Sequence, residues 1–226
     1  SAVVAKYLAP KGARTMAMIG NGAQSEFQCL AFKTICGIDT VRLYDIDPQA
    51  TAKAARNLAG KGLTVIPCAS AQEAVQGAEI ITTCTADKAQ NKVLSDHQVR
   101  PGVHLNAVGG DCPGKTELEA DILRRASVFV EFTPQTRIEG EIQQMEPEFP
   151  VVEFWQVLTG AAPGRRSDDE ITLYDSVGFA ISDFSALRCV RDATADTDLQ
   201  QHIDLIADPD DPKDLFSLMD VLAPVS

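Results

Sequence analysis

Short apolar runs alternate with longer helical segments along most of this chain, and this alternation limits the folds that it can form. The strand-like runs lie at residues 15–19, 40–44, 63–66, 79–83, 103–108, 128–131 and 171–174. The helical segments lie at residues 2–8, 23–34, 48–58, 71–75, 154–158 and 178–193. Strands that alternate with helices are typical of βαβ units, whose strands run parallel. We therefore expect an α/β fold with a doubly wound, mostly parallel sheet.

The charge of the chain is negative and unevenly distributed. The net charge is −12 over 226 residues, and eight Asp but only one Lys lie from Asp196 onward. Nucleic-acid binding requires a basic face, so we expect no nucleic-acid partner. The acidic C-terminal segment is interpreted as a solvated tail, with a partner-binding tail as the alternative.

The apolar and cysteine content indicates a soluble protein of a reducing compartment. No run approaches the roughly 20 apolar residues that a membrane span needs, and we expect no contact with a membrane. The six cysteines form no CxxC pair and show no metal-type spacing with the three histidines. We therefore expect free thiols, no metal site and a cytoplasmic location.

A glycine turn follows the first expected strand. Residues 20–25, Gly-Asn-Gly-Ala-Gln-Ser, form a GxGxxS variant of the GxGxxG pattern. Gly20 permits a tight turn out of the strand, and a side chain at Gly22 would hold a pyrophosphate away from the helix N-terminus. Ser25 is small enough for the helix to pack on the strand. Glycine turns also occur without nucleotides, so this pattern alone leaves a purely structural turn open.

A carboxylate at the end of the second expected strand makes the nucleotide interpretation stronger. Asp45 lies 25 residues beyond Gly20, where a carboxylate can bind ribose hydroxyls and repel a 2′-phosphate. Asp45 could instead cap the next helix, but Asp47, followed by Pro48, already suits that role. Together, the turn and Asp45 predict a Rossmann-type domain that binds NAD rather than NADP.

Two later strands end in polar or glycine-rich segments. Residues 82–87 follow the fourth strand, and residues 106–110 follow the fifth. Ligands of open α/β sheets bind at the carboxyl ends of the strands. Both segments are therefore expected at the nucleotide site, although the threonines are equally consistent with ordinary turns.

Asp111 comes directly after Gly109 and Gly110, at the end of the fifth expected strand. Two glycines let the backbone pass close to a flat ligand. A carboxylate beside a nicotinamide, in a cleft from which water is excluded, could accept and return protons. A carboxylate that only stabilises the turn is the alternative.

The sequence around Asp111 closely resembles the ornithine cyclodeaminases, a family that shares a superfamily with mu-crystallin. The specific stretch is residues 106–118, NAVGGDCPGKTEL. The resemblance extends over nearly the whole chain and includes residues 19–27, 134–144, 175–179 and 211–216.

By matching position, the resemblance implies that Asp111 is the catalytic acid and base and lies beside the substrate together with Val177. It implies that Ala23 and Gln24 contact the diphosphate of NAD and that Asp45 contacts the ribose. The implied NAD site also includes Gly20, Gly22, Thr85, Leu105, Asn106, Ala107, Val108, Lys115 and Ser176. A surface lysine is the structural alternative for Lys115, and a helix cap is the alternative for Ser176.

The resemblance also divides the chain into three parts. Residues 1–12 would be a connecting helix, residues 13–177 the NAD-binding domain, and residues 178–226 a C-terminal helix and acidic tail. In this family an N-terminal segment forms most of a second domain, which binds the substrate carboxylate and builds the dimer interface. We find no counterpart of that segment, so we expect only remnants of the second domain here and a homodimer in the complete protein.

The activity that the resemblance implies is the conversion of L-ornithine to L-proline and ammonia, with NAD used and regenerated in each turnover through a cyclic imine. Such an enzyme is an ammonia-lyase. One alternative is an NAD-dependent amino-acid dehydrogenase or ketimine reductase of the same superfamily. Another is a non-catalytic NAD-binding protein similar to mu-crystallin. The sequence does not choose firmly between ornithine and lysine as substrate.

Overall fold

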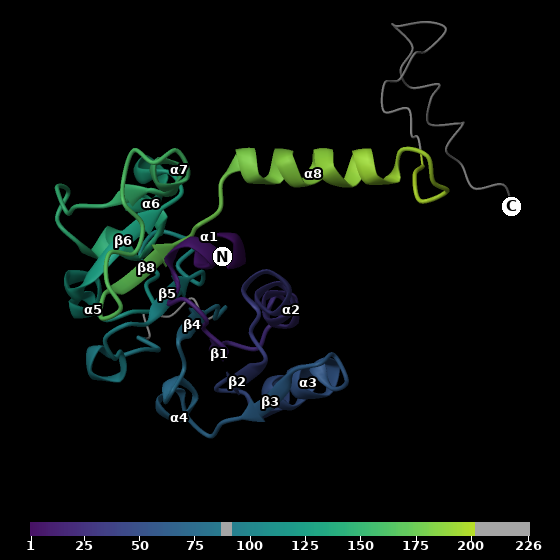
Figure 1. The fold of residues 1–226 in the computed structure, drawn as a ribbon, viewed down its shortest axis with the longest axis horizontal. Coiled ribbons are helices and arrows are strands. Elements are labelled where there is room, and N and C mark those ends of the chain that lie inside the picture. Colours follow the sequence, from purple (N-terminus) through teal and green to yellow (C-terminus); the bar gives the residue numbers. More distant parts are fainter. Residues whose placement is uncertain (87–91, 202–226) are drawn as a thin grey trace, which may run out of the picture. The chain divides into compact units, whose positions relative to one another are not determined.

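The computed structural model describes residues 1–86 and 92–201, and the chain divides into two compact units, Ser1–Phe179 and Ala180–Ser226. Residues 202–226, which hold most of the acidic tail and the segment at 211–216, lie outside the described residues, as does residue 87 of the expected site segment. The first unit contains one eight-stranded sheet in the order β3-β2-β1-β4-β5-β8-β6-β7 (Figure 1). The strands are β1 (Thr15–Ile19), β2 (Thr40–Tyr44), β3 (Thr64–Pro67), β4 (Ile80–Thr83), β5 (His104–Ala107), β6 (Ala126–Val130), β7 (Val152–Glu153) and β8 (Ile171–Asp175).

Every neighbouring pair of these strands runs parallel, which confirms the predicted α/β class and the doubly wound sheet. The helices are α1 (Ala2–Leu8), α2 (Ser25–Cys36), α3 (Pro48–Leu58), α4 (Ala71–Val75), α5 (Ala120–Arg125), α6 (Thr133–Glu139), α7 (Phe154–Leu158) and α8 (Ala180–Thr194), with short 3₁₀ turns η1 (Asp96–Gln98) and η2 (Glu141–Gln144). The sequence did not predict α5, α6 or β7.

Two apolar layers cover the two faces of the sheet, because alternate residues of a strand point to opposite faces. Met16 and Met18 of β1 belong to a core layer with residues of α1, α2 and α3. Ala17 and Ile19 belong to the other layer, with residues of α4, α5 and η2. The buried strands therefore lie between helices, as expected for a parallel sheet.

The chain reverses its direction across the sheet between β1 and β4. From β1 it proceeds outward through β2 and β3, and it then returns to place β4 on the other side of β1. The pairings Ile19↔Thr83 and Thr83↔Ala107 align the carboxyl ends of β1, β4 and β5. Ala107 also pairs with Asp175, so β8 ends at the same edge. Ligands of doubly wound sheets bind at such a reversal.

Two helices begin later than the sequence predicts. Helix α2 was expected from residue 23 and begins at Ser25, because the turn continues to a hydrogen bond from the Ser25 N–H to the Gly22 carbonyl. Helix α8 was expected from residue 178 and begins at Ala180, because the Gly178 N–H donates to Glu131.

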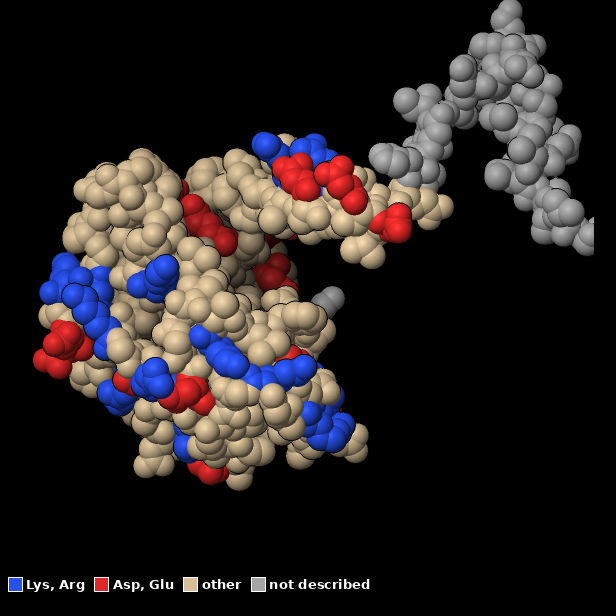
Figure 2. All heavy atoms as spheres, turned by 45° about the vertical axis from the view of Figure 1, so that its right-hand side comes forward, with Lys and Arg blue, Asp and Glu red and all other residues tan. Residues whose placement is uncertain are grey.

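The second unit contains α8, in which no residue is buried. Ile181, Phe184, Leu187 and Val190 are exposed. Within residues 1–86 and 92–201, no helix is long and apolar enough to cross a membrane. On the face of the molecule in Figure 2, Lys and Arg side chains lie in small groups next to Asp and Glu side chains.

Candidate functional site at the carboxyl edge of the sheet

The turn after β1 is built around Gly20. Its φ of 94° lies in the left-handed region, and a Cβ atom there would overlap the carbonyl oxygen of Cys84. A larger residue would therefore strain the turn and displace the segment after β4. The next N–H, that of Asn21, donates to Oδ2 of Asp45 over 2.6 Å. The turn and Asp45 thus lie together.

Asp47, and not Asp45, caps the helix that follows, as the sequence predicts. Asp47 caps α3, because its carboxylate accepts the Gln49 N–H over 2.9 Å and Pro48 begins the helix. Asp45 is half-buried, and its two oxygens accept the N–H groups of Asn21 and Asp47. Each carboxylate oxygen can accept more than one hydrogen bond, so Asp45 retains acceptor capacity toward a ligand.

The residues after Gly20 differ in burial in a way that suits a ligand over the turn. Gly22, Ala23 and Gln24 are exposed, whereas Ser25 is buried and its hydroxyl oxygen lies 2.9 Å from the Gly22 carbonyl oxygen and 2.8 Å from Oε2 of Glu26, between which its one proton is shared. A Cβ atom at Gly22 would meet no heavy atom within 4 Å. The fold itself therefore does not require glycine at this position. A ligand that approaches the backbone closely would require it.

An ion pair that the sequence analysis missed lies beside the turn. Lys53 of α3 binds Glu26 of α2 over 2.9 Å and also donates to the Gly22 carbonyl. Burial alone would raise the pKa of Glu26, but hydrogen bonds from Lys53, Asn57 and Ser25 hold this pKa at about 2. The positive charge of Lys53 is thereby neutralised within the protein.

Thr85 connects the glycine turn to the segment that follows Asp111. Its N–H donates to Oε1 of Glu117 over 2.8 Å, and its hydroxyl donates to the same oxygen. Its carbonyl accepts a hydrogen bond of 2.9 Å from Nζ of Lys115. Its methyl group lies 3.0 Å from the position of a Cβ atom at Gly20. Lys115 has only 4% of its side chain exposed, so it is not the surface lysine of the alternative interpretation.

Asp111 lies at the same edge of the sheet as the glycine turn. Its Oδ1 is 3.1 Å from Nζ of Lys115, which in turn binds Thr85 beside Gly20. The side chain of Asp111 is 62% exposed. The tip of the loop, including Pro113, is exposed as well. The expectation of a carboxylate in a dry cleft stays a prediction.

The end of β5 presents little surface to a ligand. Leu105, Asn106 and Ala107 are buried in the sheet, whereas Val108 is half-buried. Asn106 contacts a ring nitrogen of His104 over 3.1 Å inside the core. Of the four residues expected to contact NAD, Val108 is therefore the one whose side chain reaches the surface. The contacts of the others stay a prediction.

The segment after β8 joins the same edge. The Ser176 N–H donates to the Ala107 carbonyl over 2.9 Å, and Val177 follows, half-buried. The Ser176 hydroxyl and the Gly178 N–H both donate to Glu131, at the end of β6. Ser176 thus binds Glu131 instead of capping α8. Sequence reasoning missed Glu131, although its place as the last residue of an expected strand was a usable signal.

Three buried carboxyl groups lie beneath the Asp111 loop, and the sequence analysis assigned none of them a role. Glu117, Glu141 and Asp175 have at most 1% of their surface exposed. Burial raises the pKa of Glu141 to about 8 and that of Asp175 to about 7. Carboxyl groups are costly to bury unless they are hydrogen-bonded.

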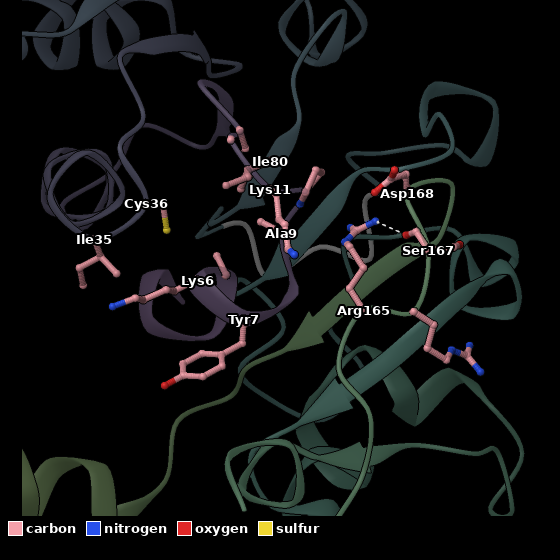
Figure 3. A pocket seen from close by; sticks show the side chains of 15 residues that line it. Lys6, Tyr7, Ala9, Lys11, Ile35, Cys36, Ile80, Arg165, Ser167 and Asp168 are labelled. Carbon is pink, nitrogen blue, oxygen red and sulfur yellow. Dashed lines mark hydrogen bonds between the residues drawn. The ribbon is translucent and has the colours of Figure 1, made fainter. Parts of the chain in front are cut away.

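A cavity of about 520 Å³ lies elsewhere, where α1 meets the loops before β1 and β8 (Figure 3). Its lining includes Lys6, Tyr7, Lys11, Arg165 and Asp168. These residues are near the amino ends of the strands, and none of the sequence-predicted site residues lines the cavity. Among the described parts of the chain, no group of His, Cys, Asp and Glu has the arrangement of a metal site.

The fold and the carboxyl edge define the class of the protein. A doubly wound parallel sheet with a glycine turn after β1 and a carboxylate after β2 is a Rossmann-type domain. The ornithine cyclodeaminase/mu-crystallin family model matches residues 1–198. The chain therefore belongs to the ornithine cyclodeaminase/mu-crystallin family, which confirms the resemblance seen in the sequence.

Curated relatives include two bacterial proteins named ornithine cyclodeaminase. The protein of Brucella suis biovar 1 is 64% identical over 97% of this chain, and that of Agrobacterium fabrum strain C58 is 62% identical over the same share. The chain spans 61% and 62% of the length of these proteins, respectively.

Solved structures of related proteins share the fold. A lysine cyclodeaminase, described as recognising L-lysine, L-ornithine and L-2,4-diamino butyric acid, superposes with a TM-score of 0.85 at 33% identity, over 96% of this chain and 63% of its own. An archaeal alanine dehydrogenase, described as a dimer with bound NAD, gives 0.83 at 30% identity, over 91% of this chain and 65% of its own.

Proposed function

We propose that this chain is the NAD-binding part of an ornithine cyclodeaminase, an ammonia-lyase that converts L-ornithine to L-proline and ammonia. The observation that carries the proposal is the continuous contact from Gly20 through Thr85 and Lys115 to Asp111. It brings the expected nucleotide turn and the expected reactive carboxylate to one edge. The relatives named ornithine cyclodeaminase support the choice of reaction and substrate.

The residues at the edge fit NAD. Open space over Gly22 admits a diphosphate to the start of α2, where Ala23 and Gln24 are exposed. Asp45 is placed to accept the ribose hydroxyls, and its charge disfavours a 2′-phosphate. Since Lys53 is already paired with Glu26, it does not offer a free cation to that phosphate. The archaeal relative with bound NAD supports the same cofactor.

When bound, NAD would supply hydride chemistry and be regenerated within each turnover, so that no net NADH forms. The chain's own contribution is proton transfer and orientation. We assign Asp111 to hold and return protons at the substrate nitrogens, because its carboxylate is accessible at the edge. Lys115 orients that carboxylate, and Val177 would lie beside the substrate.

The test is an incubation of the full-length protein with NAD and isotopically labelled ornithine. The proposal predicts equal amounts of proline and ammonia with no net change in NADH absorbance. A dehydrogenase would instead accumulate NADH in step with ammonia, and an NAD-binding protein without activity would release neither product. Either of these two results would contradict the proposal.

We extend the proposal to the assembly, the domains and the location of the protein. Residues 1–12 would form a helix that connects to the substrate and dimerisation part of the complete protein, residues 178–226 would return toward that part, and residues 13–177 would form the NAD-binding domain. The exposed apolar side chains of α8 and the dimeric archaeal relative support a homodimer. All six cysteines are free thiols, which supports a reducing compartment such as the cytoplasm.

A further inference from the structure

The loop that carries Asp111 rests on a buried carboxyl group. The Glu117 carboxyl lies directly against Gly109, where a Cβ atom would overlap it. The same group accepts both hydrogen bonds from Thr85. Glu117 therefore needs a glycine above it and fixes the segment after β4 beside it. Its position determines how the loop and the glycine turn are spaced.

Glu117 is in turn held by Glu141, at the start of η2. Oε1 of Glu141 accepts the Glu117 N–H over 2.6 Å, and Oε2 accepts the Leu118 N–H over 3.1 Å. Oε2 also accepts a hydrogen bond of 3.1 Å from the side-chain amide of Gln144. An ionised carboxyl group has two acceptor oxygens in one plane, which match two successive peptide N–H groups. Glutamine in place of Glu141 would turn an NH₂ donor toward one of these two N–H groups.

Asp175 anchors this arrangement to the sheet. It is the last residue of β8, and its Oδ2 accepts the Ile142 N–H over 2.9 Å. A Cβ atom at Gly140, just before Glu141, would lie 2.7 Å from both oxygens of the Asp175 carboxyl group. Contacts therefore run from the end of β8 through η2 to Glu117 and reach Thr85 beside the glycine turn.

We infer that Glu141 is a positioning residue that holds the Asp111 loop by binding the backbone of Glu117 and Leu118 with both carboxyl oxygens. This inference rests on the proposed function of Asp111. It accounts for a carboxyl group that is fully buried and therefore cannot itself reach a ligand. Gly110 lies over the Glu141 carboxyl group: a Cβ atom added at Gly110 would lie 3.4 Å from Oε1 of Glu141. The loop therefore packs directly on Glu141.

The experiment compares Glu141→Gln with wild type in the full-length protein, and uses Glu146→Gln as the matched control because Glu146 is exposed. At pH 9, where the Glu141 carboxyl group is ionised because its pKa is about 8, and at a temperature where both variants are folded, kcat for proline formation should fall at least tenfold in Glu141→Gln. KM for ornithine should change less than threefold, because displacing the reactive group raises the energy of the transition state more than it weakens substrate binding. Glu146→Gln should match wild type.

A Glu141→Gln protein that melts earlier but keeps kcat within twofold of wild type would show a merely structural role and overturn the inference. Should the variant not fold, amide hydrogen exchange of the wild type decides. The Glu117 and Leu118 amides should exchange as slowly as those of β5, and exchange as fast as in an exposed loop would overturn the inference. If the wild-type protein forms no proline, the proposed function is refuted instead. The exchange measurement would still test whether Glu141 holds the backbone of Glu117 and Leu118.

Discussion

At the scale of single residues, the carboxylates of this chain have very different partners. Asp47 caps a helix, Asp45 receives the N–H of the glycine turn, and Asp111 is paired with Lys115 at the edge of the sheet. Asp45 and Asp47 are only two residues apart, so they form a matched pair for testing which carboxylate serves the cofactor and which serves the fold.

We predict that Asp45→Ala weakens NAD binding about tenfold or more and reduces the preference for NAD over NADP, because the ribose loses a charged acceptor. Asp47→Ala should lower the free energy of unfolding by about 1 kcal/mol through loss of the α3 cap and leave the NAD dissociation constant unchanged. Titration calorimetry and urea unfolding measure the two quantities. Equal NAD affinities in the two variants would contradict the assignment of Asp45.

Sequence reasoning found Asp45 and Asp47 because both follow a strand at distances that local rules explain. It did not find Glu117 or Glu141, because a glutamate in a polar stretch is normally a surface residue. Their burial depends on contacts that no local rule predicts: Gly109 makes room for the carboxyl group of Glu117, and Gly110 lies over that of Glu141. Likewise, the exposure of Asp111 could not be predicted from the buried strand before it.

At the scale of elements, the connection from β1 to α2 separates the needs of the fold from those of a ligand. Gly20 is required by its backbone angle and by the carbonyl oxygen of Cys84. Gly22 has free space around it. The strands and the helices before β5 were predicted within a few residues. The position of β8 between β5 and β6 was not predicted, because it depends on contacts between residues that are far apart in the sequence.

We predict that Gly22→Ala leaves the melting temperature within about 2 °C of wild type but weakens NAD binding at least tenfold, because the new methyl group would meet only the diphosphate. Gly20→Ala should lower both the melting temperature and the NAD affinity, since it strains the turn itself. Differential scanning fluorimetry with and without NAD checks both variants. A Gly22→Ala protein with unchanged NAD affinity would show that no diphosphate lies over this turn.

At the scale of the whole molecule, buried titratable groups link stability to pH. The folded protein raises the pKa of Glu141 to about 8 and that of Asp175 to about 7 by burial. The unfolded chain releases these protons near pH 4, so the stabilisation is complete below that pH and is lost as the pH rises to about 8. Burial lowers the pKa of His104 to about 3. This shift makes the folded state more stable as the pH rises, but only up to about pH 6.5, where the histidine of the unfolded chain loses its proton.

We therefore predict that the free energy of unfolding decreases between pH 6.5 and 8, where the two carboxyl groups act without opposition from His104. Each carboxyl group contributes at most about 1.4 kcal/mol per pH unit while it is protonated only in the folded state. Urea unfolding at several pH values measures the slope, and Glu141→Gln should make it shallower than in wild type. A slope that is equally steep in the variant would contradict a raised pKa at Glu141.

We propose that Asp111 faces a nucleotide bound at the carboxyl edge of the sheet and transfers protons there. The decisive variant is Asp111→Asn in the full-length protein, with NAD affinity and proline formation measured on the same preparation. We expect an NAD dissociation constant within about threefold of wild type and a kcat reduced by about a hundredfold or more, because the amide cannot accept and return a proton. Proline formation at the wild-type rate would contradict this proposal.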